Sequence, residues 1–163
     1  WLFLEYGVPD TYSGPLLALS SITIGFAAIF SAGIAHRLGP VKAIVLTQAS
    51  STIFMFAIPF MPGATEAAAV YLVRAALMNM AGPIMDAYLM GIIDKDDRGI
   101  ASAINSIIWR LPNSATTIIG GILLAAGYYA LPFILASTIY LIAITAFYIN
   151  FKDVSPNRDI QVA

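Results

Sequence analysis

The chain has 163 residues, of which 60% are hydrophobic and only 10% charged, and its formal net charge is −1. Because soluble domains carry about 25% charged residues, this composition excludes an ordinary soluble protein, and the near-neutral charge gives no support for nucleic-acid binding. The sequence contains no cysteine and a single histidine. This excludes disulfide bonds and metal sites built on cysteine or several histidines, and no cofactor is expected.

Long apolar runs predict an all-α integral membrane protein. Residues 11–35 and 43–65 carry no charge, and Arg110 is the one charged residue between Gly99 and Phe151. A membrane-spanning helix needs about 20 mostly apolar residues, and backbone groups in lipid must be satisfied within helices or a closed barrel. Uninterrupted runs, in place of short alternating segments, favour a polytopic helical bundle over a barrel.

The elements follow in order along the chain. Residues 1–12 form an outer segment, of which 1–6 read as the end of a preceding helix. Turn residues rich in Gly, Pro and Asp then divide the chain. Five transmembrane helices are expected, at about 13–35, 41–60, 65–93, 100–126 and 131–151. A tail at 152–163 completes the chain.

The distribution of Lys and Arg predicts the orientation in the membrane. Basic residues lie in the loops after the first and third helices and in the tail, whereas segments 1–12, 61–66 and 127–132 contain none. Since cytoplasmic loops carry an excess of Lys and Arg, we expect the C-terminus to lie in the cytoplasm and Trp1 to lie outside the cell. The expected location is the plasma membrane. With an odd number of spans, the chain would begin outside the cell. Because it has neither an initiator Met nor a signal peptide, this beginning suggests a fragment of a longer protein.

The loop after the first helix carries a motif. Residues 33–42 (GIAHRLGPVK) resemble the short cytoplasmic loop of the major facilitator superfamily, which typically reads G-x-x-x-D-R-x-G-R-R/K. His36 stands where Asp is usual and Pro40 where a basic residue is usual. Arg37 and Gly39 fall on the Arg and second Gly of the pattern, while Gly33 and Lys42 lie one position from its first Gly and its last basic residue. The motif is read either as a topology anchor or as a latch that holds one access state.

A second loop strengthens the resemblance. Asp97, Arg98 and Gly99 are similar to the acidic-Arg-Gly loop of the same family, two helices later. The order of loops and spans resembles helices eight to twelve of a twelve-helix transporter over essentially the entire chain. The resemblance implies a secondary transporter, not an enzyme, that moves a small solute by alternating access. Its partners would be the lipid bilayer and the N-terminal half of the same transporter.

Polar residues inside the fourth expected helix indicate a cavity wall or a packing seam. Arg110 lies near the middle of that helix, where a charge costs at least about 2.5–3.5 kcal/mol. Ser102, Ser106, Arg110, Asn113 and Thr117 recur every three or four residues and so share one face. Serine and threonine stripes also serve helix packing, and both interpretations remain open.

The third expected helix carries Asn79 and Asp86 on one face, with Arg74 pointing roughly 120–140° away from it. Asp86 is the candidate for a proton or cation site, because poor solvation favours the neutral carboxyl. It could equally neutralise Arg110. Arg74 could bind solute, or reach the outer surface and anchor Glu66.

Two prolines fall inside expected helices. Pro83 and Pro112 each remove a backbone hydrogen bond, which predicts either static kinks or hinges. We expect the first, third and fourth helices to line the solute path and the second and fifth to support it. The residues placed in the cavity are Arg110, Asn113, Asn79 and Asp86.

Two other interpretations of the sequence are considered besides a transporter. One is a stand-alone five-helix protein that acts as a homo-oligomeric structural or binding module. The other, an intramembrane enzyme, has little support because the sequence lacks a paired-Asp motif and an HExxH motif. Efflux of a drug or metabolite and uptake of a metabolite both fit, and coupling to protons rests on Asp86 alone.

Overall fold

The structure, a computed structural model, describes residues 1–154, apart from the side chains of Phe3, Lys95 and residues 108–115. Every regular element within this part is helical. The α-helices are α1 (Leu2–Tyr6), α2 (Ser13–Leu38), α3 (Pro40–Ala57), α4 (Ala64–Ile92), α5 (Arg98–Ala125) and α6 (Leu131–Phe151). Three short 3-10 helices, η1 (Asp10–Tyr12), η2 (Ile58–Phe60) and η3 (Lys95–Asp97), lie in the connections.

Four helical segments in the described part are long and apolar enough to cross a membrane. They are Asp10–Leu38, Pro40–Phe60, Ala64–Ile92 and Leu131–Phe151. Helix α5 has 28 residues, but it includes positions 108–115, and its described segment Thr116–Ala125 is apolar and shorter than a span. The chain is therefore an integral membrane protein on the length and apolarity of its helices.

A single residue makes the turn between α2 and α3. Gly39 has φ +80° and ψ 154°, a conformation that is open to glycine and strained for other residues. Its N–H donates to the carbonyl of Ala35 at 2.9 Å, which closes α2. Pro40 then begins α3, where the missing N–H costs no hydrogen bond. The helix thus ends at Leu38, three residues after the expected boundary.

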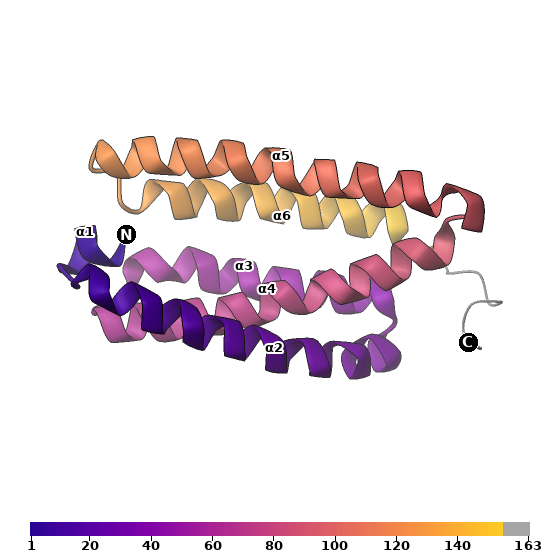
Figure 1. Cartoon of the computed structure of the whole chain (residues 1–163), viewed down its shortest axis with the longest axis horizontal. Helices are drawn as coiled ribbons and strands as arrows, with labels where there is room; N and C mark the ends of the chain where they lie inside the picture. The colour runs from indigo at the N-terminus through magenta and orange to yellow at the C-terminus, as the bar shows by residue number, and fades with distance from the viewer. Residues whose placement is uncertain (155–163) are drawn as a thin grey trace.

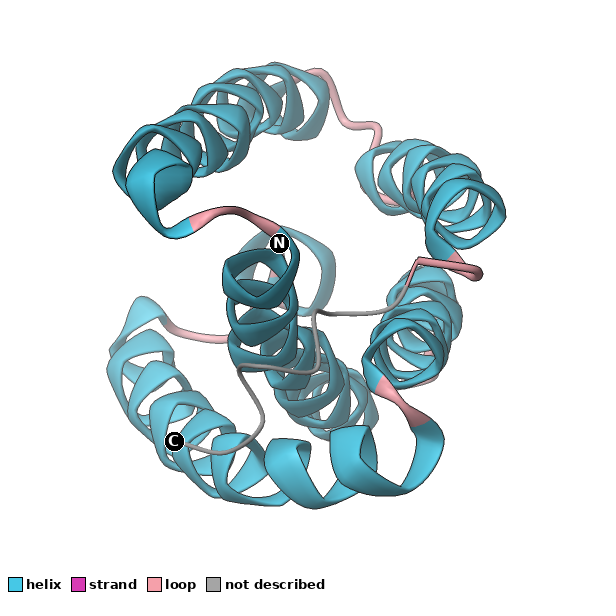
Figure 2. Ribbon diagram, turned by 90° about the vertical axis from the view of Figure 1, so that its right-hand side faces the viewer, coloured by secondary structure: helices cyan, strands magenta, loops and turns pink. Residues whose placement is uncertain are grey.

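Each long helix runs antiparallel to the one before it in the chain, along the long axis of the bundle (Figure 1). Helix α3 packs along α4 and α6, α2 packs along α4, and α5 has its main contact with α6. Figure 2 shows the helices end-on. The core between α3 and α4 is built on Ala43, Ile44, Ala81 and Ile84, with Phe147 of α6 packed against it. Small residues at this seam let the two helices approach closely.

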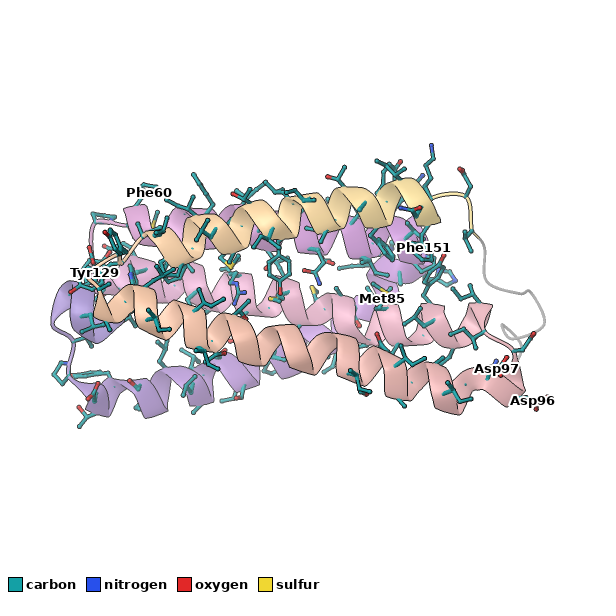
Figure 3. All side chains as sticks on the ribbon, turned by 90° about the horizontal axis from the view of Figure 1, so that it is seen from above. Phe60, Met85, Asp96, Asp97, Tyr129 and Phe151 are labelled. Atoms are coloured by element: carbon teal, nitrogen blue, oxygen red, sulfur yellow. The ribbon has the colours of Figure 1, made fainter. Side chains whose placement is uncertain are left out.

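The two ends of the bundle differ in chemistry. Figure 3 shows Phe60 and Tyr129 at one end and Asp96, Asp97 and Phe151 at the other. The α2–α3 and α4–α5 connections, which the basic residues flank or occupy, lie at the second end, where α6 also finishes (Figure 1). This arrangement agrees with the orientation drawn from the loop charges.

At each end of the bundle, aromatic side chains contact neighbouring segments of the chain. At the first end, the Tyr6 hydroxyl donates to the carbonyl of Met61 at 2.6 Å, and Trp1 contacts the rings of Tyr6 and Phe133. Burial, together with the carboxylates of Glu5 and Glu66, raises the pKa of the Tyr6 phenol. At the second end, buried Tyr88 donates to the carbonyl of Val154 at 3.1 Å.

Candidate functional site

A cavity of 560 Å³ lies between α3, α4, α5 and α6. Its walls are mostly apolar, with Met78, Met85 and Phe147 among them. In Figure 3, Met85 lies in the interior of the bundle, away from both ends. The polar side chains that line the cavity are Gln48 from α3, Asn79 and Asp86 from α4, Asn105 and Ser106 from α5, and Tyr140 from α6. Apolar walls with a few polar groups are typical of small-molecule sites.

Among the described residues, α5 makes few contacts with α3 and α4, which leaves space for the cavity between these helices. On the α4 side, small residues leave room: Ala81 and Gly82 line the cavity, and a Cβ added at Gly82 would meet no atom within 4 Å. The volume corresponds to a small organic molecule, since ligand pockets span about 300–1,000 Å³.

Asp86 is the charged residue among the described side chains that line the cavity. It is exposed to this space, as is Asn79, seven residues earlier on the same face of α4. The Asn79 amide donates to the carbonyl of Ala75 at 2.8 Å, which holds that side chain against its own helix. The structure therefore brings a carboxylate and a carboxamide to one wall of the cavity.

The helices that line this cavity differ from those expected to line the solute path. Within the described residues, α2 contributes nothing to the cavity, whereas α3 and α6, expected only to support, both line it. Helix α2 instead presents large apolar side chains to the exterior, such as Phe26 and Ile29. The difference arises because α3 and α6 are apolar on average, yet each brings one large polar side chain to the cavity, Gln48 and Tyr140.

The position of Arg74 also differs from one expected alternative. Its guanidinium does not reach outward to Glu66, and its Nη2 instead donates to Sδ of Met78 at 3.0 Å, one turn further into α4. It lies in a narrow cleft with Ser51, Thr52 and Met55 of α3 and with Tyr140 of α6. The Ser51 hydroxyl donates to the Arg74 carbonyl at 3.1 Å, which joins α3 to α4 at this level.

Three expected site residues lie outside the described side chains. Arg110, Asn113 and Pro112 belong to the segment 108–115 of α5. Of the predicted stripe on this helix, Ser106 lines the cavity. Its neighbour Asn105 also does so and was missed. The signal for Asn105, Gln48 and Tyr140 was present in the sequence, since each is a large polar side chain within a predominantly apolar span.

The remaining predicted residues lie in α4 and the loops. Helix α4 continues through Pro83, whose ring nitrogen carries no hydrogen for the carbonyl of Asn79. Arg37 and Lys42 are exposed at the α2–α3 turn, beside Gly33 and Gly39. In the α4–α5 connection Asp97 and Gly99 are exposed, and Arg98 Nε donates to the carbonyl of Ile93 at 3.4 Å, capping α4.

No group of three or more His, Asp or Glu side chains suitable for a metal ion occurs within the part of the chain that the structure describes. The site's chemistry, as far as it is described, is that of hydrogen bonding, one carboxylate and apolar contact.

Comparison with known proteins identifies one family. The model of the Major Facilitator Superfamily matches residues 1–162. No curated protein and no solved structure matches the chain.

Proposed function

Because the chain belongs to the major facilitator superfamily, we propose that the cavity between α3, α4, α5 and α6 is the path of a small solute through the membrane. Members of this family are secondary transporters and not enzymes, so we interpret the cavity as a passage for solute and not as a catalytic site. The observation that carries the proposal is a space of 560 Å³ with polar groups from four helices, inside a protein whose helices are otherwise apolar.

The proposal assigns the chain to helices eight to twelve of a twelve-helix transporter, with the N-terminal half of the same transporter as partner. Many transporters place the solute between two helical bundles that rock against each other. The weak packing of α5 against α3 and α4 supports a cavity that can change shape. Both export, as of a drug or metabolite, and import fit a mostly apolar cavity, and the plasma membrane with a cytoplasmic C-terminus remains the proposed setting.

The loops after α2 and α4 would lie on the cytoplasmic side. Gly33, Arg37, Gly39 and Lys42 on the first loop, and Asp97, Arg98 and Gly99 on the second, are proposed to help hold one access state. The support is their common end of the bundle (Figure 1). Pro83, and Pro112 by its position, are proposed as hinges.

Asp86 supports coupling to protons. A carboxylate that lines a cavity within a membrane changes its charge when it takes up a proton, and the change alters its interactions with solute and with neighbouring polar groups. Asn79 on the same wall, together with Asn113 and Arg110 at the centre of α5, would complete the polar part of the path.

The test replaces Asp86 by Asn in the full-length protein and compares it with Asp96→Asn, a matched change in the exposed α4–α5 connection. Uptake of radiolabelled small organic solutes into vesicles is measured with and without an imposed pH gradient. We expect Asp86→Asn to keep downhill solute movement and to lose accumulation driven by the gradient, while Asp96→Asn keeps both. Full gradient dependence in Asp86→Asn would overturn the coupling role, and absence of any movement by the unsubstituted protein would overturn the transport function.

A further inference from the structure

The charge of Arg74 lies at the middle of α4. Helix α4 spans Ala64–Ile92, and Met78 is its central residue. Since Nη2 of Arg74 is 3.0 Å from Sδ of Met78, the guanidinium reaches from a Cα one turn nearer the outer end to the level of the helix centre. A charge at the centre of a membrane helix is costly and marks functional positions.

The guanidinium lacks acceptors of matching strength in the described part of the chain. It has five N–H donors, and its side-chain acceptor is a thioether, which is a weak one. Nε is buried and has no hydrogen-bond partner among the described residues. The phenol of Tyr140, from α6, lines the same cleft as Arg74.

This guanidinium lies directly beside the cavity. Gln48, Met78 and Tyr140 line both the cleft that holds Arg74 and the larger cavity. Met78 and Tyr140 therefore stand between the guanidinium and the solute space. Methionine has three rotatable side-chain bonds and adapts readily to neighbouring groups, so a rotation of Met78 would place the guanidinium at the cavity wall.

We propose that Arg74 is the anion-recognition residue of this cavity, and that the solute carries a carboxylate or a similarly planar acidic group. The guanidinium fork matches such a group with two parallel hydrogen bonds, which supply the acceptors that Met78 does not. This inference rests on the proposed function, since it names the chemical class of the solute. The competing choice is a cation held by Asp86, which lines the same cavity.

The experiment uses the purified full-length protein in detergent and three probes that differ in charge and little in shape: benzoate, benzylamine and benzyl alcohol. Ligand that binds the folded state raises the melting midpoint. We expect benzoate to raise the midpoint by roughly 2–4 °C, and the other two to leave it nearly unchanged. Arg74→Gln should abolish the benzoate shift, whereas Lys152→Gln, which removes a positive charge from an exposed position just after α6, should retain it.

Arg74→Lys is a second variant that keeps the inference testable if Arg74→Gln fails to fold. It keeps the positive charge and loses the planar fork, so the shift by benzoate should shrink but still exceed that by benzyl alcohol. Stabilisation by benzylamine alone, by all three probes equally, or by none of them would overturn the inference. A benzoate shift that persists in Arg74→Gln would also overturn it, and a lower midpoint without ligand would then assign Arg74 a structural role. None of these results depends on vesicle transport, which tests the proposed function separately.

Discussion

Arg74 and Asp86, two charged residues of α4, occupy different surroundings. Asp86 opens onto the cavity, while Arg74 lies in a cleft with Met78 and Tyr140. The angular separation of Asp86 and Asn79 from Arg74 could be predicted from helix periodicity. The direction of the Arg74 side chain could not, because helical side chains lean toward the N-terminus. That lean favours the outer surface, and only packing against α3 and α6 shows the opposite direction.

The prediction for single residues concerns Gly39 in the turn between α2 and α3. Replacing Gly39 by Ala places a Cβ on a backbone with φ +80° and ψ 154°, although no atom lies within 4 Å of that Cβ. The cost is therefore backbone strain, and we expect a loss of about 1–3 kcal/mol in stability. Thermal unfolding of the full-length protein in detergent measures it.

Gly33→Ala is the control for this change. Gly33 is helical, has open space for a Cβ, and should gain roughly 0.5–1 kcal/mol from helix propensity. Equal effects of the two substitutions would show that the turn does not depend on the positive φ of Gly39.

At the scale of elements, apolar length and turn residues predict where helices lie, but average hydropathy does not predict which helices line a cavity. Helix α6 illustrates this. It has no charged residue within Leu131–Phe151, yet Tyr140, Ala143 and Phe147 form one wall of the cavity. Pairing of α3 with α4 and α6 depends on the match of small and large side chains across each seam, which one sequence does not reveal.

Helix α6 therefore provides a matched pair of substitutions. Ala143 lines the cavity and Ala146 does not, although both are exposed residues of the same helix. Ala143→Trp should fill part of the 560 Å³ space and abolish most of the solute uptake by vesicles. Ala146→Trp should leave most of the uptake, with both proteins reaching the membrane in equal amounts. Equal loss in both variants, or retention in both, would exclude this wall of α6 from the path.

For the whole molecule, the basic residues of the turns gather at one end of the bundle, and the family match gives the class of protein. Both could be anticipated from loop composition and the two loop motifs. The central claim is that the cavity opens to the two sides of the membrane in turn.

The most direct test is the accessibility of Asn79→Cys, since Asn79 lines the cavity and this chain contributes no cysteine of its own. A membrane-impermeant thiol reagent is applied to the full-length protein from either side of sealed vesicles. We predict reaction from both sides, with an imposed solute or pH gradient raising one rate and lowering the other. The control Ile142→Cys, 65% exposed on α6 outside the cavity lining, should react from neither side. Labelling of Asn79→Cys from one side only, under every gradient, would contradict the account.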